Sequence, residues 1–234
     1  MSNSEVIAYL EGLADSEIAT HSLRYFKTGK GEYGYGDKFL GIRVPVLRKV
    51  AKSFQGISKR EISILLKSEY HEARLLSLLI LVGQFSAGDE NRRNLIYNLY
   101  LKHTKYINNW DLVDTSAPNI VGAWLIDRGR SKLYELAGST SLWERRISII
   151  STLYFIRNGD YSDTLKLAEI LITDSEDLIH KAVGWMLREI GNRDRAVEEK
   201  YLKKHYKQMP RTMLRYSIEK FSKDSRQRFL KGDI

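Results

Sequence analysis

The sequence repeats itself every 36 residues. Four segments align, at 72–79, 109–114, 145–150 and 181–186, and place Arg74, Trp110, Arg146 and Ala182 in one column. A further step of the same length falls in another apolar segment, at 214–221. Apolar residues recur around the column at the spacing of an amphipathic helix. A period in this range, with two helices in each unit, is typical of α-solenoids, in which every unit buries its apolar face against its neighbours.

The rest of the chain agrees with a helical fold. Alternating strand patterns are nearly absent, and Pro45, Pro118 and Pro210 each precede a helical pattern, where a first-turn proline is tolerated. We therefore predict an all-α protein, an α-solenoid whose stacked units present a concave groove. Of the 234 residues, 43% are hydrophobic, which suffices for one sizeable core, so we expect residues 1–234 to form a single repeat domain.

The charge of the chain is strongly basic and uneven. The formal net charge is +9, and residues 181–234 hold fifteen Lys and Arg against seven Asp and Glu. This balance predicts a polyanionic partner, nucleic acid before membrane. The alternative is a solvated helix face without a ligand.

Several classes of function are excluded or disfavoured. The chain has no cysteine, so disulfides, thiolate catalysis and cysteine-based zinc sites are ruled out. The five histidines lack the spacing of metal ligands, and the glycines at 29–34 match a dinucleotide-binding motif only in their letters, because no strand precedes them. We expect neither metal nor cofactor. The N-terminus is no signal peptide, and the longest apolar run, 75–83, is too short for a bilayer, so we expect a cytoplasmic protein.

Chemistry-bearing residues gather at related positions of the repeat. We number positions within each aligned segment from its residue in the column, which is position zero. Trp110 and Arg146 are at position zero, Trp185 is at plus three, Asp114 at plus four and Arg188 at plus six. Positions zero, three and four share one face of a helix, and plus six lies at its edge. A carboxylate flanked by indoles favours a positively charged ligand or transition state. The alternative is that the tryptophans are core residues and Asp114 caps or pairs locally.

Further basic residues are candidates for contacts with phosphate. Lys27 adjoins a glycine-rich segment, Arg145 and Arg146 begin one helical pattern, and Arg211 and Arg215 begin another. Arginine side chains and helix N-termini suit phosphate oxygens. The alternative for each is a charge that simply faces solvent.

The chain resembles the DNA alkylation repair family, the AlkD-like DNA glycosylases with HEAT-like repeats. The resemblance covers most of the sequence and includes the motif Asn109-Trp-Asp-Leu-Val-Asp114. Its other carriers are the segments 25–27, 39–49, 143–147, 181–189 and 210–221. It implies a stack of HEAT-like repeats around a basic groove, and an enzyme that excises N3- and N7-alkylated purines. The glycine-rich insertion at 29–36 departs from the shortest members.

The resemblance also assigns residues to roles. Trp110, Asp114 and Trp185 match the catalytic Trp, Asp and Trp of the family. Arg146 matches a groove arginine that contacts DNA, Arg188 resembles a further basic groove residue, and Tyr25 resembles an aromatic residue near the DNA.

The expected chemistry needs no strong general acid, because an alkylated purine cation leaves as a neutral base. The positive charge then grows on the deoxyribose, as in glycoside hydrolysis. An ionised Asp114 would stabilise that charge and orient the attacking water. The expected partner is duplex DNA carrying alkylated purines, bound by a monomer that is nucleoid-associated while on DNA. Two alternatives stay open: a catalytically inactive relative that binds distorted or branched DNA, and a helical-repeat scaffold for protein interactions.

Overall fold

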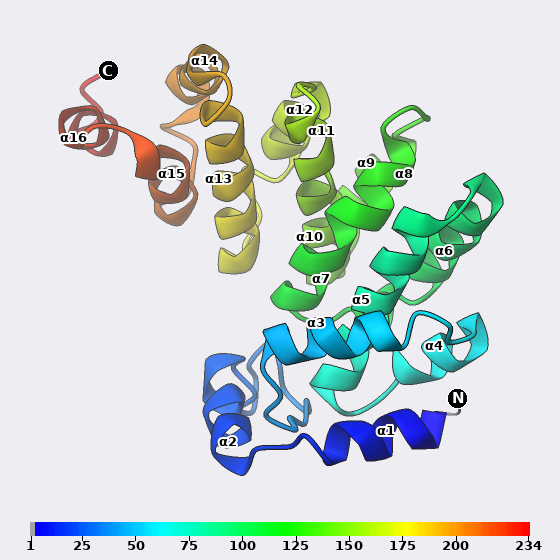
Figure 1. Cartoon of the computed structure of the whole chain (residues 1–234). Helices are drawn as coiled ribbons and strands as arrows, with labels where there is room; N and C mark the ends of the chain where they lie inside the picture. The colour runs from blue at the N-terminus through cyan, green and yellow to red at the C-terminus, as the bar shows by residue number, and fades with distance from the viewer. Residues whose placement is uncertain (1–2) are drawn as a thin grey trace. The chain divides into compact units, whose positions relative to one another are not determined.

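The computed structural model describes residues 3–234, and its ordered elements are helices (Figure 1). Within these residues the only β-type pairing is an isolated bridge between Lys38 and Tyr70. The all-α prediction is therefore confirmed. The chain divides into two compact units, one ending at Ile120 and one running from Val121 to Ile234. The single repeat domain stays a prediction.

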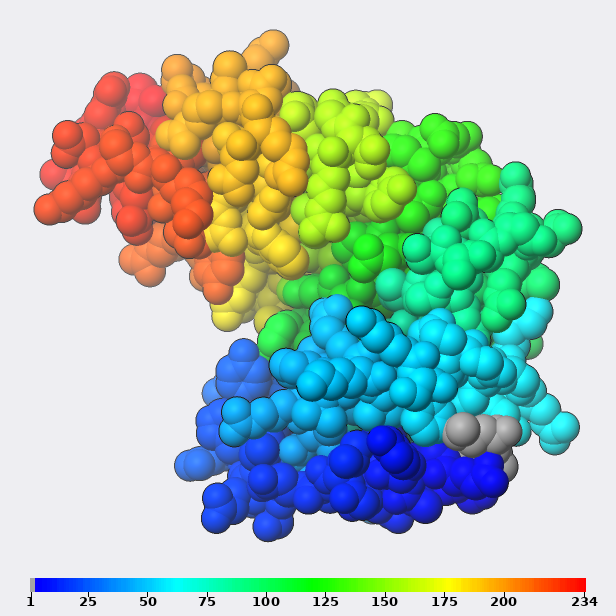
Figure 2. Space-filling model, viewed as in Figure 1, coloured from blue at the N-terminus to red at the C-terminus, as the bar shows by residue number. Residues whose placement is uncertain are grey.

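The first unit is built from helices that pack around α5 (His71–Ala87). Its elements are α1 (Asn3–Glu11), α2 (Ser16–Tyr25), α3 (Val44–Ser53), α4 (Lys59–Leu65), α5 (His71–Ala87), α6 (Glu90–Lys102), η1 (Thr104–Tyr106) and α7 (Trp110–Ala117). Helix α5 is central and packs against α3, α4, α6 and α7. The outer side of α3 lies on the surface of this unit, in sky blue in Figure 2, and its Arg48 and Lys49 are exposed.

The second unit is also built from helices. After a π-helical segment, η2 (Pro118–Gly122), come α8 (Ala123–Leu125), α9 (Ser131–Ala137), α10 (Leu142–Ser151), α11 (Leu153–Arg157), α12 (Ser162–Ile170), α13 (Asp177–Gly191), α14 (Arg195–His205), α15 (Arg211–Ser217), η3 (Ile218–Lys220) and α16 (Lys223–Lys231). Helix α13 packs against both α10 and α15.

The 36-residue column falls on the helices that pack in sequence within each unit. Arg74 lies on α5, Trp110 on α7, Arg146 on α10 and Ala182 on α13. Helix α5 packs on α7 in the first unit, and α10 packs on α13 in the second. Three members of the column are buried, and Trp110 is half-buried. The column therefore falls on the buried side of α5, α10 and α13, and at the half-buried start of α7.

Side-chain caps set many of the helix starts. Asp15 accepts hydrogen bonds from the backbone N–H groups of Glu17 and Ile18 at the start of α2. Asp89 and Asp194 cap α6 and α14 in the same way. Each cap satisfies a backbone donor that has no partner within its own helix.

Pro118 differs from expectation. Pro45 and Pro210 stand at helix starts, but Pro118 directly follows α7 and opens the π-helical segment. A proline inside an α-helix removes a backbone donor and clashes with the preceding turn. The wider π turn accommodates it, and the side chain of Asn119 donates to the carbonyl of Thr115 at 2.8 Å. The helical direction therefore continues past this proline.

Among residues 3–234, none of the helices combines the length and the apolar character needed to cross a membrane.

Candidate functional site

Helix α7 presents Trp110 and Asp114 on its open side. Asn109 begins the helix, and its side chain accepts a hydrogen bond from the backbone N–H of Trp110 at 2.8 Å. Trp110 and Asp114 are one helical turn apart and both are half-buried, whereas Leu112 and Val113 are fully buried. The apolar side of α7 thus faces the core, and the indole and carboxylate reach the surface together.

The buried side of α7 is fixed by a hydroxyl pair. Tyr100 on α6 and Ser116 lie 3.0 Å apart through their hydroxyl oxygens, and Ser116 donates to the carbonyl of Leu112. Burial raises the pKa of Tyr100, and the charge of Asp114 adds to this rise against the effect of Ser116. Tyr100 therefore stays a neutral phenol, and the negative charge of Asp114 extends to this part of the core.

The indole of Trp110 is supported by aromatic rings from the end of α2. The ring of Phe26 stacks on it with centroids 5.5 Å apart and planes inclined by 21°. Tyr25 meets the same indole edge-on at 5.9 Å, and 57% of its surface is exposed. Offset stacking and edge contacts are the favoured arrangements of aromatic pairs. Two consecutive residues therefore hold Trp110, and Tyr25 extends the aromatic surface into solvent.

A buried ion network lies beneath these rings. The Nε2 atom of His71 is 2.8 Å from an Asp111 carboxylate oxygen, and its Nδ1 atom is 3.4 Å from Asp37. Asp37 also pairs with Arg74 at 2.7 Å. Buried charges are tolerated when they are paired and hydrogen-bonded. The network joins the loop before α3, the start of α5 and the start of α7.

The electrostatics of this network favour a protonated His71. Burial on its own would lower the pKa of His71, but the charge and hydrogen bond of Asp111, together with Asp37, raise it to about 9 against the opposing charge of Arg74. Burial would raise the pKa of Asp37, yet His71 and Arg74 hold it below its usual range. At neutral pH the four side chains therefore carry two positive and two negative charges.

Glu72 fastens the preceding loop to α5. Its carboxylate accepts hydrogen bonds from the backbone N–H groups of Leu40, Gly41 and Ile42 at 2.8–3.2 Å. Gly41 adopts a φ of +82°, and a Cβ there would lie 2.0 Å from the carbonyl oxygen of Asp15. Only glycine fits this close approach, which holds Asp37 and its neighbours in place.

Trp185 lies on α13 in the second unit. The side chain is half-buried, and its indole N–H donates to Glu189 at 3.2 Å, one turn along the helix. Glu189 also pairs with Arg193 at 2.8 Å. The neighbouring Gly184 allows α15 to approach, because a Cβ there would lie 2.5 Å from the carbonyl oxygen of Met213.

Two of the predicted DNA-binding arginines are tied to the protein itself. Arg146 is 5% exposed, and its guanidinium donates to the carbonyl of Leu178 at 2.5 Å in the first turn of α13. Arg145 pairs with Asp174 at 2.6 Å and donates to the carbonyl of Ser139. Both arginines thereby link α10 to the segments that flank it.

The other predicted contacts are more accessible. Lys27 is exposed and has a φ of +55°, Arg215 is exposed, and Arg211 is exposed while donating to the carbonyl of Leu230. Arg188 is half-buried in an ion pair with Glu219. The DNA-binding roles of all these residues remain predictions.

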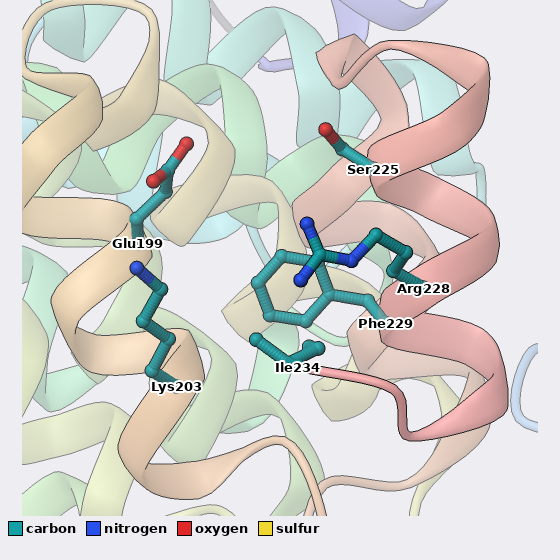
Figure 3. A pocket seen from close by; sticks show the side chains of 6 residues that line it. All are labelled: Glu199, Lys203, Ser225, Arg228, Phe229 and Ile234. Carbon is teal, nitrogen blue, oxygen red and sulfur yellow. The ribbon is translucent and has the colours of Figure 1, made fainter.

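A separate polar hollow lies between α14 and α16 (Figure 3). Its lining residues are Glu199, Lys203, Ser225, Arg228, Phe229 and Ile234. Figure 3 shows the side chains of α14 facing those of α16 across it. The hollow mixes a carboxylate with two cations, and Arg228 already donates to the carbonyl of Asp233 at 3.1 Å. It therefore offers a less uniform charge than an anion site requires.

The ion network around His71 is the main feature that the sequence pattern did not predict. His71 lies 34 residues from Asp37 and 40 from Asp111, so no local motif joins them. Two features of the sequence could have indicated it: Arg74 is a charged residue within an apolar segment, and Asp111 directly follows Trp110.

Comparison with known proteins identifies the family. The family model described as DNA alkylation repair enzyme matches residues 6–221. Among solved structures, a predicted DNA alkylation repair enzyme from Enterococcus faecalis is 18% identical, with a TM-score of 0.69 over 90% of this chain and 97% of that one. At this identity the likeness concerns the fold. No curated protein matches the chain. Because the family model spans nearly the whole sequence, the chain belongs to the DNA alkylation repair enzyme family.

Proposed function

We propose that this protein is a monofunctional DNA glycosylase that hydrolyses the N-glycosidic bond of N3- and N7-alkylated purines in duplex DNA. The observation that carries the proposal is the Trp110–Asp114 pair on the open side of α7, in a chain of this family. The family supports a role in the repair of alkylated DNA, and the pair supplies the chemistry.

Asp114 is the proposed catalytic carboxylate. As the bond to a cationic base breaks, positive charge moves to the deoxyribose, and a fixed negative charge nearby stabilises it. The same carboxylate orients the attacking water and accepts its proton. Asp114 is half-buried on a helix whose other side is anchored in the core, so it has the rigid support that such electrostatic stabilisation requires.

The tryptophans and basic residues have supporting roles. The face of an indole attracts cationic character with about 0.5–2 kcal/mol for each contact. Trp110 is proposed to pack against the sugar, and Trp185 is proposed as a further catalytic residue because it matches a tryptophan of the family motif. Exposed Tyr25, Lys27 and Arg215 are proposed to contact the DNA backbone. Selectivity then comes from the charge of the lesion rather than from a pocket shaped to the base.

A base-release assay tests the proposal. The wild type and Asp114→Asn are incubated with a duplex that contains one 7-methylguanine, and the free base is measured in single turnover at pH 7.5. We expect release by the wild type and a loss on the order of 10²–10³ in rate for the variant, since one preorganised electrostatic group is removed. Asp127→Asn is the matched control, because it removes the same charge from an exposed position and should keep the full rate.

Other results would replace the proposal. Tight duplex binding without base release in the wild type would favour a catalytically inactive DNA-binding relative. Weak binding with little dependence on salt would favour a protein-interaction scaffold. Release of uracil as fast as 7-methylguanine would contradict selection by charge.

A further inference from the structure

The aromatic contacts of the first unit form a continuous stack from His71 to Trp110. The imidazole lies against Phe26 at 4.8 Å and against Phe39 at 4.7 Å, and these two rings stack on each other at 5.0 Å. Phe26 in turn stacks on Trp110 at 5.5 Å. One ring, that of Phe26, therefore stands between the imidazole and the indole.

A second connection runs through the backbone. His71 bonds to Asp111, which directly follows Trp110 in the first turn of α7. The other oxygen of that carboxylate accepts the backbone N–H of Leu112 at 2.9 Å. His71 thus contacts the base of the stack and the start of the helix that carries Trp110 and Asp114.

The ring can satisfy both of its acidic neighbours only in the charged form. Each nitrogen faces a carboxylate oxygen, and a neutral imidazole carries one N–H, whereas the imidazolium carries two. His71 is 1% exposed, so bulk solvent does not reach the ring to supply the missing donor. Arg74, which pairs with Asp37, is the second cation of the network. Helices α3, α4 and α6 also pack on α5, but their charged residues are exposed or half-buried.

We propose that His71 is a positioning residue: as an imidazolium held between Asp37 and Asp111, it fixes the indole of Trp110 and the first turn of α7. It does not touch the substrate. Its effect on rate rests on the proposed function, but its effect on Trp110 does not.

The first test observes Trp110 directly by ¹⁹F NMR of the whole protein labelled with 5-fluorotryptophan. The chain has four tryptophans, and the Trp110 signal is assigned with Trp110→Phe. Between pH 7 and 10 we expect this signal to shift with a midpoint near the pKa of His71, about 9. The signals of Trp124, Trp143 and Trp185 belong to the second unit and serve as internal references.

The second test removes the charge while keeping the packing. His71→Phe retains an aromatic ring but leaves Asp111 unpaired, so His71→Phe/Asp111→Asn is made beside it to restore the balance of charge. In the double variant we expect the Trp110 signal to lose its pH dependence and to broaden. His103→Phe is the matched control: it replaces another buried histidine of this unit, whose Nδ1 contacts the Leu99 carbonyl, and should leave the signal unchanged.

A rate measurement links the position of Trp110 to catalysis. For the double variant we expect single-turnover release of 7-methylguanine at pH 7.5 to fall roughly 10- to 100-fold with DNA affinity unchanged, because small misplacements of a catalytic group are costly. A Trp110 signal that does not respond to pH in the wild type, or is the same in the double variant, would overturn the proposal. If the wild type releases no base while Trp110 still follows His71, the proposed function fails and the positioning role stands.

Discussion

At the scale of single residues, the second unit buries an acid that its surroundings keep neutral. Glu198 on α14 is 1% exposed, and its Oε1 atom has no hydrogen-bond partner among the described residues. Burial raises the pKa of Glu198 to about 8, with help from Glu199 and against Arg195 and Arg188. The folded state therefore holds a proton that the unfolded chain releases near pH 4.5.

This proton makes stability fall as pH rises. Between pH 4.5 and 8 the native state binds more protons at Glu198 than the unfolded state does, so the free energy of unfolding decreases across that range and is lowest above it. Glu198→Gln imitates the protonated acid and should raise Tm at pH 9, by roughly 2–4 °C for each kcal/mol recovered, while leaving Tm at pH 4 unchanged.

Thermal unfolding followed by circular dichroism checks this expectation. Glu199→Gln is the control, because Glu199 is a half-buried neighbour whose side chain is 39% exposed and pairs with Arg195. An equal gain for both variants at pH 9 would mean that general relief of negative charge, rather than the burial of Glu198, is responsible.

The residues of the candidate site differ in how far the sequence predicts their surroundings. The spacing of four between Trp110 and Asp114 places both on one side of α7, as the structure has them. The pattern did not indicate that Arg146 would be buried against the carbonyl of Leu178, because the sequence marks which helix face a residue occupies but not which backbone it meets. The ion network of His71 was not predicted for a related reason, because its partners are distant in the sequence and only the fold brings them together.

At the scale of elements, two glycines set how closely helices approach in the second unit. A Cβ at Gly184 on α13 would lie 2.5 Å from both the Met213 carbonyl and the Cβ of Tyr216 on α15. A Cβ at Gly122 would lie 2.2 Å from the Ser151 carbonyl. In both cases the obstacle includes backbone, which cannot move without shifting a helix.

Gly184→Ala should therefore destabilise the protein by about 1–3 kcal/mol, the usual cost of overpacking a core. The same substitution at Gly129 meets no atom within 4 Å and is the matched control. Urea unfolding curves provide the comparison. Equal midpoints for the two variants would show that α13 and α15 separate at little cost.

The helical periodicity predicted the elements well. The apolar face of a helix must be buried against another apolar face, and in a repeat protein the neighbouring repeat supplies it. The periodicity predicted the segment after α7 poorly. Pro118 indicates a helix boundary because it lacks a backbone N–H, yet the chain continues as a π-helix from Pro118 to Gly122. The choice between a break and a wide turn depends on the packing of residues 118–122, which a pattern of residue types does not contain.

At the scale of the whole molecule, the net charge of +9 should appear in how DNA binding responds to salt. Each phosphate neutralised by Lys or Arg contributes about 0.9 to the slope of log K against log salt for duplex DNA. Arg215→Gln should lower the magnitude of this slope by about 1 and weaken binding to all sequences alike. Fluorescence anisotropy between 50 and 200 mM salt measures it.

Lys132→Gln is the control for this measurement, because Lys132 is half-buried and already pairs with Glu135. A slope near zero for the wild type would contradict phosphate contacts altogether. Equal changes for the two variants would show that the total charge matters and the place of Arg215 does not.

The loop before α3 is anchored at its base rather than at its tip. The backbone N–H of Gly34 donates to the carbonyl of Lys27. Further along the loop, the Glu72 carboxylate accepts hydrogen bonds from the backbone N–H groups of residues 40–42. Residues 28–33 lie between the first pair of anchors and are mostly exposed. Loop tips closed in this way tolerate insertions, because the added length changes the closure entropy only slowly. Insertions and deletions during evolution can therefore accumulate at residues 28–33 while the rings that support Trp110 keep their geometry. The same residues are a suitable place to attach a fluorescent label.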